Sequence, residues 1–192
     1  MNDSDNEIKI TIVGYTKTGK SKFFEYLENN NIEDLNISDY QPTSGGKYCR
    51  KCIIYNNNYY NLNIWDTSGE EKYKSLIKYF YRDADVILLF FSYNDNKSFQ
   101  EAKNLLESIK EFSTKSDVII ALIGNKYLEK NYSKENNNIL NEEEVLEFVT
   151  DNNLIYGHLS ILEKYSNGFN ELANKIIKEY VNKTKKIGKN YK

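Results

Sequence analysis

The sequence predicts an α/β fold: a three-layer P-loop sandwich in which a mostly parallel six-stranded sheet has one antiparallel edge strand and helices on both faces. Three observations lead to this prediction. Strand-like runs alternate with segments of helical periodicity, which is typical of a parallel sheet covered by helices. Residues 86–91 and 118–123 are apolar without interruption, as parallel strands buried on both sides are. A glycine-rich loop joins the first strand to the first helix.

The N-terminal half of the chain is expected to form a strand, a helix and a hairpin. Residues 8–13 read as a strand, and Phe23, Phe24 and Leu27 give the next segment one apolar helical face. Two strand-like runs between Lys47 and Trp65 surround three successive asparagines, which predicts a hairpin. This hairpin would place the antiparallel strand at the edge of the sheet.

The C-terminal half continues the alternation of strands and helices. A helix follows the strand at residues 86–91, and Ser98 with Glu101 predicts a capping box at its start. A second helix is expected over residues 142–151, a last strand over residues 154–159, and a terminal helix after it. The apolar stripes of the first and the last of these helices are Phe99, Ala102, Leu105, Leu106, Ile109 and Phe112, and Phe169, Leu172, Ala173, Ile176, Ile177 and Tyr180.

Composition indicates a single soluble domain. The chain has 192 residues, of which 40% are hydrophobic and 28% charged, and we expect a disordered segment 1–6, a domain 7–181 and a basic tail 182–192. A net charge of −2 gives no indication of nucleic-acid binding. The longest apolar run is too short to span a bilayer, and the acidic N-terminus does not resemble a signal peptide. Cys49 and Cys52 lie on an expected strand, where residues three apart face opposite sides, so we expect two thiols rather than a zinc site.

The loop between the first strand and the first helix carries the strongest chemical signal. Residues 14–21 read GYTKTGKS and match the phosphate-binding pattern G-x-x-x-x-G-K-[ST] at every fixed position. The backbone N–H groups of such a loop and the N-terminus of its helix face a polyphosphate. We expect Lys20 to reach the outer phosphates and the Ser21 hydroxyl to ligate Mg²⁺. The loop residues expected to contact the ligand are Gly14, Thr16, Lys17, Thr18, Gly19, Lys20, Ser21 and Lys22.

Two more polar motifs follow strands. Asp66 comes directly after an expected strand and could hold the Mg²⁺ shell, and Gly69, three positions later, could offer its backbone N–H to a γ-phosphate. Asn125 and Lys126 come directly after the buried strand that ends at residue 123. Each motif alone is weak, but their order and their positions at strand ends make the combination specific.

Together these motifs resemble those of the small GTPases of the Ras superfamily, and most closely the Rab branch. The resemblance covers roughly residues 7–181. Residues 64–71, IWDTSGEE, are similar to the second switch, usually written WDTAGQE. Residues 72–77 and 80–84 resemble the Rab-type motifs that follow that switch, and residues 40–43, YQPT, are similar to the first switch.

The resemblance implies roles for residues that spacing alone does not assign. It makes Thr43 the residue that closes on Mg²⁺ and the γ-phosphate, and Tyr40 an aromatic lid over the phosphates. The implied metal ligands are Ser21, Thr43 and Asp66, and the implied cofactors are GTP or GDP with Mg²⁺. The loop with Leu162, Glu163 and Lys164 stands where the family contacts the base, with Leu162 in place of a serine. What the family implies is a switch whose two loops are ordered by the γ-phosphate and released on hydrolysis.

Glu70 departs from the family, which has a glutamine there to orient the attacking water. A carboxylate reaches as far as an amide, but about 5 Å from the γ-phosphate it costs about 3 kcal/mol per unit charge at an effective dielectric of about 20. We therefore expect Glu70 and Lys20 to be the catalytic residues of a slow hydrolysis. The alternative is that Glu70 is a solvated loop residue.

The base-reading motif departs more strongly. The family pattern N-K-x-D ends in an aspartate that accepts hydrogen bonds from guanine, whereas this chain has Leu128. Leucine accepts no hydrogen bond, so guanine preference should weaken unless Glu129, one residue later, replaces the acceptor. Lys17 stands where the family has glycine, and its side chain either adds charge to the phosphate site, hinders an arginine supplied by a partner, or points into solvent.

The resemblance also implies partners. We expect effectors, an exchange factor and a GTPase-activating protein to bind through Thr43 and the segment from Glu70 to Arg82, with the protein itself a monomer. The chain has no cysteine after Cys52 and no glycine at position 2, so no lipidation motif is seen. We expect a cytoplasmic protein, with at most weak electrostatic contact between its basic tail and an intracellular membrane.

Two functional classes therefore stay open on the sequence. The first is a GTP-hydrolysing switch in vesicle trafficking or signalling. The second is a pseudo-GTPase, non-hydrolysing or free of nucleotide, that acts as an interaction module. A nucleotide kinase is disfavoured, because such enzymes clamp phosphates with several arginines and this chain has only Arg50 and Arg82.

Overall fold

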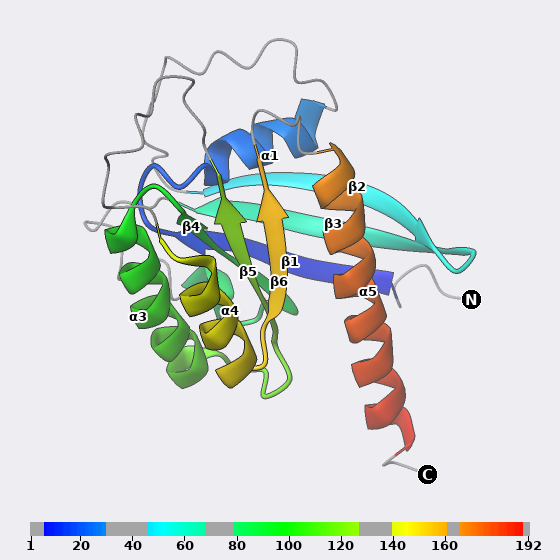
Figure 1. The fold of residues 1–192 in the computed structure, drawn as a ribbon. Helices are drawn as coiled ribbons and strands as arrows, with labels where there is room; N and C mark the ends of the chain where they lie inside the picture. Colours follow the sequence, from blue (N-terminus) through cyan, green and yellow to red (C-terminus); the bar gives the residue numbers. More distant parts are fainter. Residues whose placement is uncertain (1–5, 30–45, 68–78, 127–139, 161–165, 190–192) are drawn as a thin grey trace.

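The fold is a six-stranded sheet with helices on both faces (Figure 1). The computed structural model describes residues 6–29, 46–67, 79–126, 140–160 and 166–189 of the chain. The elements in chain order are β1 (Glu7–Gly14), α1 (Lys20–Asn29), β2 (Gly46–Tyr55), β3 (Asn58–Thr67), β4 (Val86–Ser92), α3 (Asn96–Phe112), β5 (Ile119–Asn125), α4 (Glu142–Asp151), β6 (Ile155–Leu159) and α5 (Ser166–Lys189).

The sheet has the strand order β2-β3-β1-β4-β5-β6. All neighbouring strands run parallel except β2 and β3, which pair antiparallel at one edge, so the predicted sheet is confirmed. The hairpin turns at Asn56 and Asn57, both of which have positive φ, at 48° and 62°. Asparagine tolerates this left-handed conformation better than most residues, which explains why a run of asparagines stands at the turn.

Two hydrophobic layers cover the sheet. Strand β4 is buried over its whole length, and its residues alternate between the two layers. Val86, Leu88 and Phe90 pack in the layer beneath α1 and α5, whereas Ile87, Leu89 and Phe91 pack in the layer beneath α3 and α4. Coverage on both faces is the physical reason for the uninterrupted apolar sequence of this strand.

The start of α3 differs from the prediction. The helix begins at Asn96 with Asp95 as its N-cap, and the Asp95 side chain makes no capping hydrogen bond. Ser98, expected to cap the helix, is fully buried inside its first turn. Its hydroxyl accepts from the Ser92 N–H at 2.9 Å and lies 2.6 Å from the Asp95 carbonyl, so it ties the end of β4 to α3. The predicted capping box was therefore wrong. The sequence pattern around the start of a helix shows only local contacts, whereas the Ser98 hydroxyl bonds to the preceding strand.

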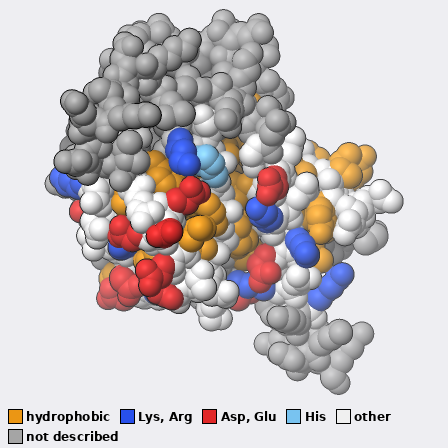
Figure 2. Space-filling view, in the orientation of Figure 1, with side chains coloured by type: hydrophobic (Ala, Val, Ile, Leu, Met, Phe, Trp, Pro, Cys, Tyr) orange, Lys and Arg blue, Asp and Glu red, His pale blue; other side chains and the backbone are white. Residues whose placement is uncertain are grey.

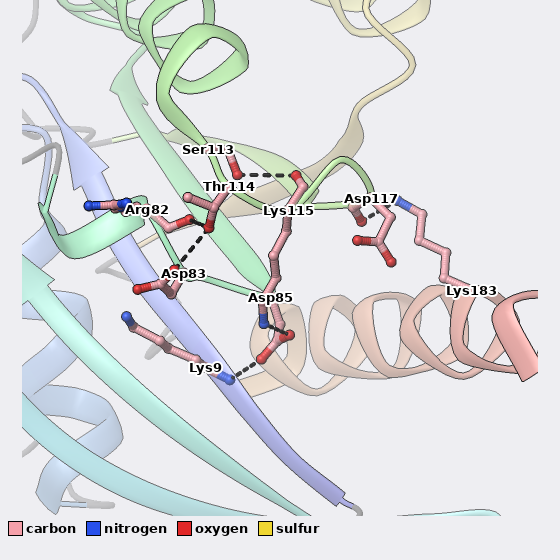
Figure 3. A network of polar contacts seen from close by, with 9 residues as sticks. All are labelled: Lys9, Arg82, Asp83, Asp85, Ser113, Thr114, Lys115, Asp117 and Lys183. Carbon is pink, nitrogen blue, oxygen red and sulfur yellow. Dashed lines mark hydrogen bonds and ion pairs between the residues drawn. The ribbon is translucent and has the colours of Figure 1, made fainter.

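The end of the sheet that carries the amino ends of β1, β4 and β5 is fixed by a network of polar contacts (Figure 3). Asp85 accepts from the Lys9 N–H at 2.8 Å and forms an ion pair with Lys115. Lys183 on α5 donates to the Asp117 carbonyl at 2.9 Å. Helix α5 continues to Lys189, past residue 181, where the sequence suggested that the domain ends. None of the described helices is both long enough and apolar enough to cross a membrane.

Candidate functional site

The polar strand ends predicted from the sequence meet at one edge of the sheet. The loop from Tyr15 to Gly19 leaves β1, Asp66 is the last residue but one of β3, and Asn125 ends β5. Because β1, β3 and β5 run in the same direction, their carboxyl ends lie at the same edge, opposite the network of Figure 3. There the Ser21 side chain bonds to that of Asp66, and the Asn125 side chain bonds to the Thr18 carbonyl of the loop.

The loop backbone needs residues that accept positive φ at three positions. Gly14 has φ of 147°, and a Cβ added to it would lie 2.4 Å from the Phe90 carbonyl oxygen, so only glycine fits there. Gly19 has φ of 93°, and Lys17 has φ of 59°. Lys17 thus occupies a left-handed position that costs an ordinary residue about 1 kcal/mol, and its side chain is exposed. This left-handed conformation explains why glycine is the usual residue at this position in the GTPases whose motifs the chain resembles.

Hydrogen bonds within the loop gather on one carbonyl group. The Thr18 hydroxyl and the Lys20 ammonium both donate to the Tyr15 carbonyl, at 2.9 Å and 2.6 Å. Lys20 is only 5% exposed, and burial lowers its pKa to about 8, although the nearby Asp66 carboxylate acts in the opposite direction. A buried lysine with a lowered pKa favours a second anion beside it, because an anion restores the charged form. This site is therefore suited to a phosphate.

Ser21 and Asp66, both predicted to ligate Mg²⁺, are in contact. The Ser21 hydroxyl donates to Oδ2 of Asp66 at 2.9 Å, and the Asp66 side chain is completely buried. A hydroxyl and a carboxylate are oxygen ligands of the kind that Mg²⁺ prefers when phosphate oxygens and water complete its shell. The described part of the chain holds no group of three His, Cys, Asp or Glu residues that could bind a metal by itself. The donor set fits a magnesium ion that arrives with a phosphate ligand.

Asn125 connects the base-reading motif to the phosphate loop. Its amide Nδ2 donates to the Thr18 carbonyl at 3.0 Å, and its Oδ1 is buried without a hydrogen-bond partner among the described residues. The backbone N–H of Lys126 donates to the Leu159 carbonyl at 3.2 Å, which fixes the start of the segment after β5 to β6. The link from Asn125 to the loop was not anticipated, because it joins residues 107 positions apart.

The remaining predicted site residues divide into two groups. Lys22 lies in α1, where its ammonium pairs with Glu25 at 3.0 Å, and Thr16 is half-buried in the loop. The others lie outside the described residues, and their predicted roles stay predictions: Tyr40, Thr43, Gly69, Glu70, Leu128, Glu129, Leu162, Glu163 and Lys164. One residue near the site was missed by the sequence analysis: Tyr93, directly after β4, whose position at a strand end was the available signal.

These features define the class of the protein: an α/β protein with a phosphate-binding loop, in which serine and aspartate form an oxygen site beside a buried lysine. The sequence model of the Ras family matches residues 9–181. The chain belongs to the Ras family.

Curated relatives place the chain near the Rab branch. It is 30% identical over 131 residues to GTP-binding protein YPT53 of Saccharomyces cerevisiae, a match that covers 68% of this chain and 57% of that protein. It is 29% identical over 174 residues to Ras-related protein Rab-18 of Lymnaea stagnalis, covering 88% and 80%. It is 32% identical over 120 residues to Ras-related protein RabC of Dictyostelium discoideum, covering 62% and 59%. The chain therefore spans less than two thirds of the yeast and Dictyostelium proteins.

Proposed function

We propose that this protein is a GTP-binding molecular switch of the Rab-like type, which hydrolyses GTP slowly and acts in vesicle trafficking or signalling. The observation that carries the proposal is the joined arrangement of Lys20, the Ser21–Asp66 pair and Asn125 at one edge of the sheet. The names of the relatives support it, since the yeast protein is described as GTP-binding and the others as Rab proteins.

The residues of this chain then have distinct tasks. Lys20 neutralises the outer phosphates, and the positive φ of Gly14 and Gly19 lets the loop backbone turn around them. Ser21 and Asp66, with the predicted ligand Thr43, would hold Mg²⁺, which would supply positive charge to offset that of the phosphates. Glu70 stands where the family has its water-orienting glutamine, and in this proposal its negative charge slows the reaction.

An aromatic surface supports a role in partner recognition. Tyr48, Trp65 and Phe80 form a contiguous group, with ring centroids 4.9 Å apart for Tyr48 and Trp65 and 6.3 Å apart for Trp65 and Phe80. Tyr48 is 48% exposed and Tyr79, beside Phe80, is 71% exposed. Because Phe80 belongs to the segment from Glu70 to Arg82, this group extends the proposed docking surface for effectors, exchange factor and activating protein. We further propose that the protein is a monomer in the cytoplasm and that it associates at most weakly with the surface of an intracellular membrane.

The nucleotide that the purified protein carries tests the proposal directly. The protein is denatured, and the released nucleotide is identified by chromatography. GDP or GTP in near-stoichiometric amount is expected, and an excess of GTP over GDP would further support slow turnover. A protein that carries an adenine nucleotide, or none and then fails to bind added GTP with Mg²⁺, would contradict the proposal. It would favour the second candidate, an interaction module that has lost guanine recognition, which Leu128 and Glu70 suggest.

A further inference from the structure

Tyr93 is fixed between the two ends of the segment that carries Leu128 and Glu129. The Tyr93 N–H donates to the Asn125 carbonyl at 3.1 Å, and the Tyr93 carbonyl accepts from the Leu140 N–H, also at 3.1 Å. Asn125 precedes that segment and Leu140 follows it. One buried residue at the end of β4 thus contacts both places where the base-reading segment meets the fold.

The side chain of Tyr93 contacts Lys126 as well. The Lys126 ammonium lies 4.8 Å from the centroid of the Tyr93 ring, within the range of a cation–π interaction. The same ammonium lies 3.8 Å from Oε2 of Glu142. Glu142 belongs to the acidic first turn of α4, and Figure 2 shows acidic side chains gathered over that part of the surface. The Lys126 ammonium thus contacts both the Tyr93 ring and the Glu142 carboxylate.

The Tyr93 ring is itself held in place. It is 2% exposed, and its hydroxyl shares a hydrogen bond with the Tyr156 hydroxyl on β6. It packs edge to face with the His158 ring, with centroids 6.0 Å apart. Gly124 makes room for it, since a Cβ there would lie 2.6 Å from Cε2 of Tyr93. Burial raises the pKa of both tyrosines, so both hydroxyls stay protonated near neutral pH.

We propose that Tyr93 is a positioning residue of the base-binding site, which acts by holding Lys126. With its ammonium fixed on Tyr93 and Glu142, Lys126 has its aliphatic stem ordered before a ligand arrives. A stem ordered in advance lowers the entropic cost of contact with a flat purine ring. The inference rests on the proposed function, because it assigns Tyr93 a task in binding the guanine nucleotide.

The test is a double-mutant cycle on nucleotide affinity. Kd for GDP with Mg²⁺ is measured by fluorescence competition for the parent, Tyr93→Leu and the matched control Tyr93→Phe, each with Lys126 and with Lys126→Ala. Tyr93→Leu removes the ring face and is expected to weaken GDP about three- to tenfold. Tyr93→Phe keeps the ring and loses only the hydroxyl, so its Kd should stay within about twofold. In the Lys126→Ala background, Tyr93→Leu should change Kd by less than about twofold.

The outcomes separate this inference from the proposed function. A parent that binds no guanine nucleotide overturns the proposed function, and the inference with it. A parent that binds GDP while Tyr93→Leu has no effect, or the same effect without Lys126, overturns the inference alone, because a purely structural role does not require Lys126.

A second readout uses the unmodified protein and does not depend on the folding of a variant. The Hε protons of Lys126 should resonate upfield of those of free lysine in NMR spectra, because the adjacent ammonium lies over the face of the Tyr93 ring. Unshifted Hε protons would overturn the inference.

Discussion

At the scale of single residues, the lowered pKa of the buried Lys20 predicts that nucleotide binding depends on pH. Burial lowers its pKa to about 8 in the absence of a ligand, whereas a bound polyphosphate favours the ammonium form. Below about pH 7 the lysine is charged with and without nucleotide, so affinity should not depend on its titration. From about pH 8 upward, binding requires the uptake of a proton, and GDP affinity should fall by up to about tenfold per pH unit.

Calorimetric titrations in buffers of different ionisation enthalpy measure this proton uptake. Lys20→Met is the control. Its affinity should be about ten- to hundredfold lower, because it loses charged hydrogen bonds, and it should take up no proton between pH 8 and 9. An equal fall in affinity for parent and variant over this range would assign the pH dependence to another group.

The negative charge of Glu70 leads us to predict that replacing this residue with glutamine increases the rate of GTP hydrolysis. Glu70→Gln keeps the length of the side chain and removes the charge, whose cost is about 3 kcal/mol when the γ-phosphate lies about 5 Å away. Single-turnover hydrolysis of GTP should become at least tenfold faster. Glu71→Gln, the adjacent glutamate, is the matched control and should leave the rate unchanged. A Glu70→Gln protein no faster than its parent would contradict the electrostatic explanation.

At the scale of structural elements, the segment between β5 and α4 carries Leu128 and Glu129, which test whether guanine can be recognised without the family's aspartate. If Glu129 supplies the acceptor, Glu129→Ala should lower GTP affinity by about ten- to hundredfold, as the loss of a hydrogen bond to a charged group does. Leu128→Asp should raise the affinity, because it restores the acceptor at its usual position. Equilibrium titration with GTP, and with ITP, which lacks the exocyclic amine, measures both effects. Unchanged affinity in both variants would exclude either side chain from base recognition.

The same scale shows what could be predicted from sequence and what could not. Helix α4 was predicted within its observed bounds, Glu142–Asp151, and the hairpin around Asn56 was predicted too, because amphipathic periodicity and turn residues are local signals. Ser98 was misread as a cap because its hydroxyl bonds to Ser92 on the preceding strand. Asn125 was predicted as a site residue, but its hydrogen bond to the Thr18 carbonyl was not, and neither was the contact of Tyr93 with Tyr156, since both contacts join segments that only the folded sheet brings together.

At the scale of the whole molecule, the two ends of the parallel strands have different tasks. The end that carries their amino termini is tied to α5 and to the loops before β4 and β5 by Asp85, Lys115 and Lys183. At the opposite end, beside the carboxyl termini of the strands, lie Lys20 and Asp66. Both are buried and ionisable, and a Mg²⁺–nucleotide complex would balance their charges. A ligand bound at that end alone should stabilise the entire domain, because it binds the folded state and not the unfolded chain.

Removal of magnesium should therefore destabilise the nucleotide-loaded protein. Ser21 and Asp66 share a hydrogen bond of 2.9 Å and would provide two oxygen ligands for the proposed ion. If EDTA weakens GDP binding about tenfold, stability falls by about 1.4 kcal/mol, and Tm should fall by about 3–5 °C for a domain of this size. Differential scanning fluorimetry of the GDP-loaded protein measures this shift, and the nucleotide-free protein should show none. Ser21→Ala lacks one of the ligands, so its GDP-loaded Tm should respond much less to EDTA than that of the parent. An undiminished response in Ser21→Ala would place the magnesium ion elsewhere.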